Sequence, residues 1–147
     1  MKHLHIIISL VIAFAGCTQR SPYDTAYVDG VVLMDGSPMQ GVSVTFSPVT
    51  NSAGGNSAGG VTDISGKFTL TTGGAPVGSG ALDGEYDVTF RKVEVRETTF
   101  EESLTGKQPN EIDLVPKKYG NAKTSGIAPV KVEKGGKNSF KFELKSK

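Results

Sequence analysis

Three residue types that usually build reactive sites or cross-links are scarce in this chain. Its 147 residues include one cysteine, no tryptophan and two histidines. A single cysteine excludes a disulfide within the monomer, so the fold must be held by packing. The histidines are His3 and His5, in a segment that we expect to be removed. The mature domain then has no imidazole for base catalysis or zinc binding, and we predict no catalytic residue, metal site or cofactor.

The chain also lacks a large excess of charge of either sign. Sixteen basic and fifteen acidic side chains give a net charge of +1. Lysines gather near the C-terminus, but Glu133 and Glu143 interleave with them and no aromatic platform accompanies them. We interpret this stretch as a solvated strand face and predict no nucleic-acid partner. The lysines concerned are Lys131, Lys134, Lys137, Lys141, Lys145 and Lys147.

The N-terminus carries the strongest local signal. A basic start is followed by an almost wholly apolar run from Leu4 to Phe14 and by small Ala15 and Gly16. The run is shorter than the roughly 20 residues that span a bilayer, and polar residues follow at once, which is typical of a secretory signal. We therefore predict a signal peptide over residues 1–16.

Cys17 follows that signal directly. Small residues before a cysteine resemble the lipobox of bacterial lipoproteins, although Phe14 stands where leucine is usual. The resemblance implies cleavage before Cys17 and acylation of its thiol, with residues 17–25 as a lipidated tether. Each buried methylene contributes about 0.8 kcal/mol, so two or more chains would fix the domain to a membrane of the cell envelope, at the periplasmic or outer-membrane face. The alternative is an ordinary signal cut near Ala15, which leaves a free thiol.

The mature part alternates apolar and polar residues with the period of a strand. Val42, Val44 and Phe46 alternate with serine and threonine, and Phe140, Phe142 and Leu144 with charged residues. The same pattern recurs at Val28, Val32 and Met34, at Phe68 and Leu70, and at Tyr86, Val88 and Phe90. Glycine-containing turns separate these runs, and no long helix competes. We predict an all-β, antiparallel sandwich of about seven strands over residues 26–147.

Local details of that sandwich also follow. Val130 and Val132 are expected to form a short partner of the last strand across Gly135-Gly136. The apolar phase changes after Phe90, which predicts a bulge, a bend or a strand end there.

Two stretches depart from the strand pattern. Asn51 to Gly60 repeats Asn-Ser-Ala-Gly-Gly, and we expect a mobile hairpin loop rather than a ligand-gripping tip. From about Glu97 to Gly126, apolar residues are scattered among charged ones. A connection of this length is often functional, so it is our first candidate for a partner surface; local packing onto the sandwich is the equal alternative. Its expected apolar anchors are Phe100, Leu104, Ile112 and Leu114.

Several runs together carry a family resemblance. They are Val28-x-Gly30-x-Val32-x-x-Asp35-Gly36-x-Pro38-x-x-Gly41-Val42-x-Val44-x-Phe46-x-Pro48, Thr62-Asp63-x-x-Gly66-x-Phe68-x-Leu70, Gly84-x-Tyr86-x-Val88, Val115-Pro116-Lys117-Lys118-Tyr119 and Asn138-x-Phe140-x-Phe142-x-Leu144. The chain resembles small planctomycete-type bacterial lipoproteins with a carboxypeptidase-regulatory-like, transthyretin-like domain. The resemblance implies a prealbumin-like sandwich without an assigned activity. The hydroxyisourate hydrolases of that fold rely on histidines that this domain lacks.

Three weaker motifs have simpler interpretations. Gly60 to Lys67 superficially looks like a phosphate loop, but its spacing is wrong and we interpret it as a hairpin turn. Asp63 and Ser65 lack the further acids of a calcium loop. Glu101 and Glu102 could act as paired carboxylates on a sugar, but adjacent acids in a polar loop are usually only solvated.

These observations favour a non-enzymatic binding or structural module of the cell envelope. Its expected partners are the membrane, through the anchor, and an envelope protein or polysaccharide. The alternative is a carboxylate-dependent enzyme that acts on envelope polysaccharide. A small-ligand carrier would need a closed apolar pocket between the sheets, and we expect too few core residues to line one.

Overall fold

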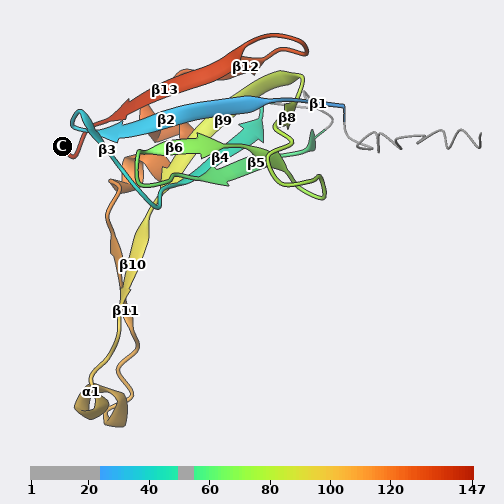
Figure 1. Cartoon of the computed structure of the whole chain (residues 1–147). Coiled ribbons are helices and arrows are strands. Elements are labelled where there is room, and N and C mark those ends of the chain that lie inside the picture. The colour runs from blue at the N-terminus through green and yellow to red at the C-terminus, as the bar shows by residue number, and fades with distance from the viewer. Residues whose placement is uncertain (1–23, 50–54) are drawn as a thin grey trace, which may run out of the picture.

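The computed structural model describes residues 24–49 and 55–147, which form a β-sandwich with one projecting arm (Figure 1). The predicted signal peptide, Cys17 and nearly all of the tether lie outside the described residues. So do residues 50–54, which include the first part of the predicted hairpin loop.

Two sheets face each other across the core. The first contains β13 (Asn138–Leu144), β2 (Val28–Met34), β3 (Ser37–Pro38) and β6 (Lys67–Thr69). The second has the order β12 (Val130–Val132), β9 (Gly84–Arg91), β4 (Ser43–Pro48), β5 (Ala58–Val61) and β7 (Thr71–Thr72). A short pair, β1 (Thr25–Ala26) with β8 (Ala81–Leu82), lies beside them. The all-β sandwich prediction is confirmed.

An aromatic cluster joins the two sheets. The ring of Phe46 on β4 lies 5.7 Å from that of Phe140 and 6.3 Å from that of Phe142, both on β13. Phe68 and Tyr86 complete the contacts of Phe46, at 6.4 Å and 5.9 Å. The side chains that the alternation placed inward are buried, including Val28, Val32, Val42, Val44, Leu70, Val88, Phe90 and Leu144, while Met34 and Phe140 are partly buried against the core. The period-2 pattern therefore assigned the inward faces correctly.

One strand pairing differs from the antiparallel expectation. β13 runs parallel to β2, with Phe142 opposite Val32. The expected hairpin between Val130–Val132 and the last strand is wrong, because β12 pairs with β9 in the other sheet. The Gly135-Gly136 turn thus passes between the sheets, and the buried Asn138 side chain holds it by accepting from the Glu133 N–H and donating to the Glu133 carbonyl.

The remaining turns show two further corrections. β9 ends at Arg91 and a new strand begins at Val93, so the predicted strand end after Phe90 is confirmed. The predicted loop over 51–60 is too long, since residues 58–60 belong to β5. The turn before Lys67 is not a hairpin: it leads from β5 in the second sheet to β6 in the first.

Candidate functional site: a projecting arm and a surface groove

Residues 93–113 form a separate structure, which we call the arm. It consists of β10 (Val93–Arg96), the short helix α1 (Phe100–Leu104) and β11 (Asn110–Asp113), with the two strands antiparallel. Figure 1 shows the arm extending away from the sandwich, with α1 at its far end. The long excursion predicted from the sequence is therefore only partly a connection packed on the core.

The second half of that excursion does pack on the sandwich. A single turn, η2 (Lys117–Gly120), is followed by α2 (Ala122–Ser125). Val115, just before η2, and Tyr119, within it, are both buried. The Tyr119 hydroxyl accepts a hydrogen bond of 2.8 Å from the Lys145 N–H. The packing interpretation is confirmed for this second half, and the arm remains the candidate partner surface.

Ion pairs brace the base of the arm. Arg91 lies 3.3 Å from Glu111 and 3.9 Å from Asp113, and Lys117 lies 3.7 Å from Asp113. Exposed pairs of this kind contribute up to about 1 kcal/mol each, and an isolated two-stranded hairpin is marginal in water. The arm thus depends on several weak polar contacts rather than on a core.

A capping box sets the start of α1. The Thr99 hydroxyl accepts from the Glu102 N–H at 3.3 Å, and the Glu102 carboxylate accepts from the Thr99 N–H at 3.1 Å. This reciprocal pair satisfies two backbone donors that a helix start leaves free. Thr105 then closes the helix, its hydroxyl donating to the Glu102 carbonyl at 2.7 Å.

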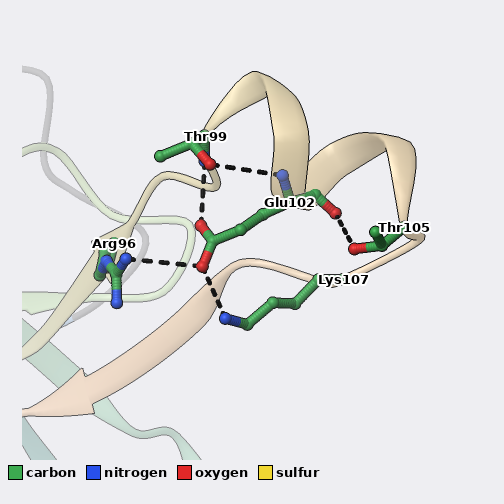
Figure 2. A network of polar contacts seen from close by, with 5 residues as sticks. All are labelled: Arg96, Thr99, Glu102, Thr105 and Lys107. Atoms are coloured by element: carbon green, nitrogen blue, oxygen red, sulfur yellow. Dashed lines mark hydrogen bonds and ion pairs between the residues drawn. The ribbon is translucent and has the colours of Figure 1, made fainter.

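Glu102 also ties α1 to the end of β10 and to the segment that leads into β11 (Figure 2). Its Oε1 atom lies 2.6 Å from the Lys107 ammonium and 3.6 Å from the Arg96 guanidinium. The hydrogen bond from Lys107 is the main reason that the pKa of Glu102 lies below its ordinary value, with the Thr99 N–H as the next cause. Glu102 is therefore held ionised, and its carboxylate fixes α1 to the rest of the arm.

This polar bracing leaves the apolar side chains of α1 uncovered. Phe100 is 79% exposed and Leu104 is 71% exposed. They are four residues apart, so they lie on one face of the helix. We call this face the tip. The expectation that Phe100, Leu104 and Ile112 anchor the excursion to the core is wrong, because all three are exposed.

The structure does not bring the two predicted acids, Glu101 and Glu102, into one recess. Glu102 lines a polar recess of about 260 Å³ together with Glu97, Arg96 and Lys107, and Glu101 is not part of its wall. A general acid needs a pKa raised towards the working pH, whereas that of Glu102 is lowered.

The other motifs have local structural roles. The Asp63 carboxylate accepts hydrogen bonds from the N–H groups of Ser65 at 2.7 Å and Lys67 at 3.0 Å. It therefore stabilises the turn in which it lies. Within residues 24–49 and 55–147, no three acidic, cysteine or histidine side chains lie close enough to hold a metal ion. No helix in this described part is long and apolar enough to cross a membrane.

A surface groove of about 860 Å³ was not predicted from the sequence. It crosses outward residues of β2, β6 and β13 and continues to β5. Its most exposed apolar residues are Val77 at 97%, Val61 at 64% and Tyr27 at 59%. We call it the groove. Its walls come from five separate parts of the chain, so no sequence motif marks it.

No family model, curated protein or solved structure matches the chain. The resemblance to transthyretin-like lipoproteins therefore stays a prediction.

Proposed function

We propose that this protein is an exported, lipid-anchored binding module of the cell envelope that captures a partner through its arm and has no enzymatic activity. The observation that carries the proposal is the tip: a braced helix at the end of a projecting hairpin, with Phe100 and Leu104 facing solvent. Exposed apolar residues that local structure holds in place are typical of interaction sites. Anchoring at Cys17 and residence in the envelope rest on the N-terminal sequence.

Capture can be tested with the full chain in its own membranes. A double substitution, Phe100→Ser with Leu104→Ser, removes the apolar tip and leaves the Glu102 bracing intact. We expect it to lose the proteins or glycans that wild type retains after affinity purification. Ile64→Ser is the matched control, since Ile64 is an 80% exposed apolar residue in a turn of the sandwich. Retention by the double variant would contradict the role of the arm.

Anchoring has its own test. Metabolic labelling with palmitate should tag the wild-type protein, and Cys17→Ser should release it from the membrane fraction, because the acylated thiol is the proposed attachment. An unlabelled wild type that begins after another cleavage site would contradict the anchor.

The alternative enzyme would use carboxylates on envelope polysaccharide. The recess containing Glu97 and Glu102 favours it, since two acids suffice for glycoside hydrolysis. Its acid–base use is disfavoured by the ionised state of Glu102. Reproducible glycan hydrolysis that is lost in Glu97→Gln, with Glu94→Gln as the control, would replace the binding proposal.

A further inference from the structure

Apolar side chains are also exposed at the end of the sandwich where the chain enters it. Tyr27 is 59% exposed and Val77 is 97% exposed, and both line the groove. The loop that carries Val77 packs closely on this entry point, because a Cβ atom at Gly80 would lie 2.9 Å from the Cα atom of Tyr27. β8, which follows the loop, pairs with β1. Local structure therefore holds both exposed side chains at the same end of the molecule.

A lysine without an ion-pair partner adjoins these side chains. The buried Asn138 donates to the Tyr27 carbonyl at 3.4 Å, which places the turn before β13 beside Tyr27. Lys137 in this turn is exposed and makes no ion pair within the described part of the chain. We call the surface formed by Tyr27, Val77 and Lys137 the entry surface.

The composition of the entry surface suits the boundary of a lipid bilayer. Tyrosine is enriched at that boundary because its ring is apolar and its hydroxyl reaches water. Valine adds apolar area, and a lysine stem can lie along lipid while its ammonium stays with the phosphate headgroups. Asp24, the first acid after Cys17, is already paired with Lys134, so its charge is neutralised at this end.

The predicted anchor would bring a bilayer to this surface. Six residues, 18–23, separate Cys17 from Asp24, so the Cα atoms of these two residues lie at most about 25 Å apart. Asp24 directly precedes β1, and Tyr27 directly follows that strand. A tether raises the effective concentration of a second contact, so a few side chains are enough to hold the domain against the same membrane.

From these observations we infer that the entry surface is a second membrane contact. Tyr27, Val77 and Lys137 lie at the headgroup boundary of the bilayer into which the acyl chains on Cys17 insert. The inference rests on the proposed anchoring and goes beyond it, because it fixes the orientation of the domain on the membrane.

This orientation holds the arm away from the lipid. β9 begins at the entry end, where Gly84 pairs with Val132, and it ends at Arg91, just before the arm. Figure 1 accordingly shows the arm leaving the sandwich at the end remote from β1. The tip then faces the aqueous space of the envelope, where it can reach a partner.

Single tryptophans test the contact, because the chain contains no tryptophan of its own. Full-length, acylated variants are purified from membranes and reconstituted in vesicles of phosphatidylethanolamine with phosphatidylglycerol. Half of the samples contain a lipid spin-labelled near the headgroup, which quenches tryptophan fluorescence at the boundary. The two test variants are Tyr27→Trp and Val77→Trp, and Phe100→Trp reports on the tip.

Ile64→Trp is the matched control. Ile64 is an exposed apolar residue, at 80%, in a turn of the same sandwich. The carbonyl of Gly66 in that turn accepts from the Val32 N–H at 2.8 Å, which places the turn towards the other end of β2. An anchored domain without a preferred orientation would expose this position to the quencher as often as the entry surface.

Quenching of the two test variants should exceed that of Ile64→Trp and Phe100→Trp about twofold or more, because an interfacial side chain lies about 5–10 Å into the boundary of headgroups and acyl chains. Adding Lys137→Glu to Tyr27→Trp should weaken its quenching. Equal quenching of Tyr27→Trp and Ile64→Trp would overturn the inference. Strongest quenching of Phe100→Trp would also overturn it, since the tip would then be the part that enters the lipid.

The anchor and the orientation fail separately in this design. Palmitate labelling of the same preparations reports acylation, and unlabelled protein would overturn both the anchor and the inference. Labelled protein without selective quenching of the test variants would overturn only the entry surface. Capture by the arm is measured independently, because Tyr27 and Val77 lie outside the arm.

Discussion

Phe142 in the sandwich and Phe100 on the arm show two opposite uses of the same side chain. Phe142 is 7% exposed and its ring lies 5.0 Å from that of Phe90, whereas Phe100 is 79% exposed and helix α1 buries no residue. The sandwich is stabilised by apolar burial between distant strands. The arm is shaped by caps and ion pairs, which leave its apolar residues exposed to solvent.

The largest expected effect separates these two phenylalanines. Phe142→Ala should lower the free energy of unfolding by about 3–5 kcal/mol because it leaves a cavity in the aromatic cluster. Phe100→Ala should change it by less than about 0.5 kcal/mol because the side chain is exposed. Denaturant unfolding measures both. Lys141→Ala, on the outward face of the same strand, is the control, and a loss equal to that of Phe142→Ala would contradict the assigned faces.

A glycine inside the sandwich gives the next largest effect. A Cβ atom at Gly30 would lie 2.5 Å from the Phe140 carbonyl oxygen and 2.6 Å from the Phe68 ring. Gly30→Ala should therefore destabilise the fold by about 1–3 kcal/mol through overpacking. Gly73→Ala is the matched control, because nothing lies within 4 Å of its Cβ position. Denaturant unfolding measures both variants. Equal unfolding midpoints would contradict the tight packing around Gly30.

The capping box should matter only to the arm. Thr99→Ala removes the hydroxyl that accepts from the Glu102 N–H and should destabilise α1 by about 1 kcal/mol. Hydrogen exchange should become faster for the amides of α1 and stay unchanged for those of β4 and β9. Thr98→Ala, one residue earlier, is the control. Faster exchange throughout the sandwich would mean that the arm and the core unfold together.

Acidification should produce the smallest and most local change. The pKa of Glu102 is lowered from 4.5, so its contribution to the tip is present above about pH 4.5 and is lost as the pH falls through the lowered pKa. The nuclear magnetic resonance shifts of the α1 amides should report this loss. Glu102→Gln should remove the pH dependence, while Glu101→Gln should keep it. A transition that persists in Glu102→Gln would assign it to another group.

The sandwich was more predictable than the arm. Residues such as Val44 and Phe46 alternate with polar neighbours, and that local pattern is enough to place them inward. The same reasoning predicted that Phe100 and Leu104 anchor the excursion, and this was wrong. The local sequence does not show whether an isolated apolar side chain in a polar stretch is covered by another part of the chain. The pairing Thr99-x-x-Glu102 fits the capping-box pattern and marks the start of α1, but the sequence analysis did not use it.

The sequence by itself determined the all-β class, the inward faces of the strands and the lack of histidine after His5, because these depend on residue identity and on short-range periodicity. Only the tertiary structure decided the parallel pairing of β13 with β2, the division of residues 97–126 into a projecting arm and a packed segment, and the groove. Each of those brings together residues far apart in the chain. Their placement depends on which strands pair and which surfaces remain uncovered, and a local pattern does not encode either.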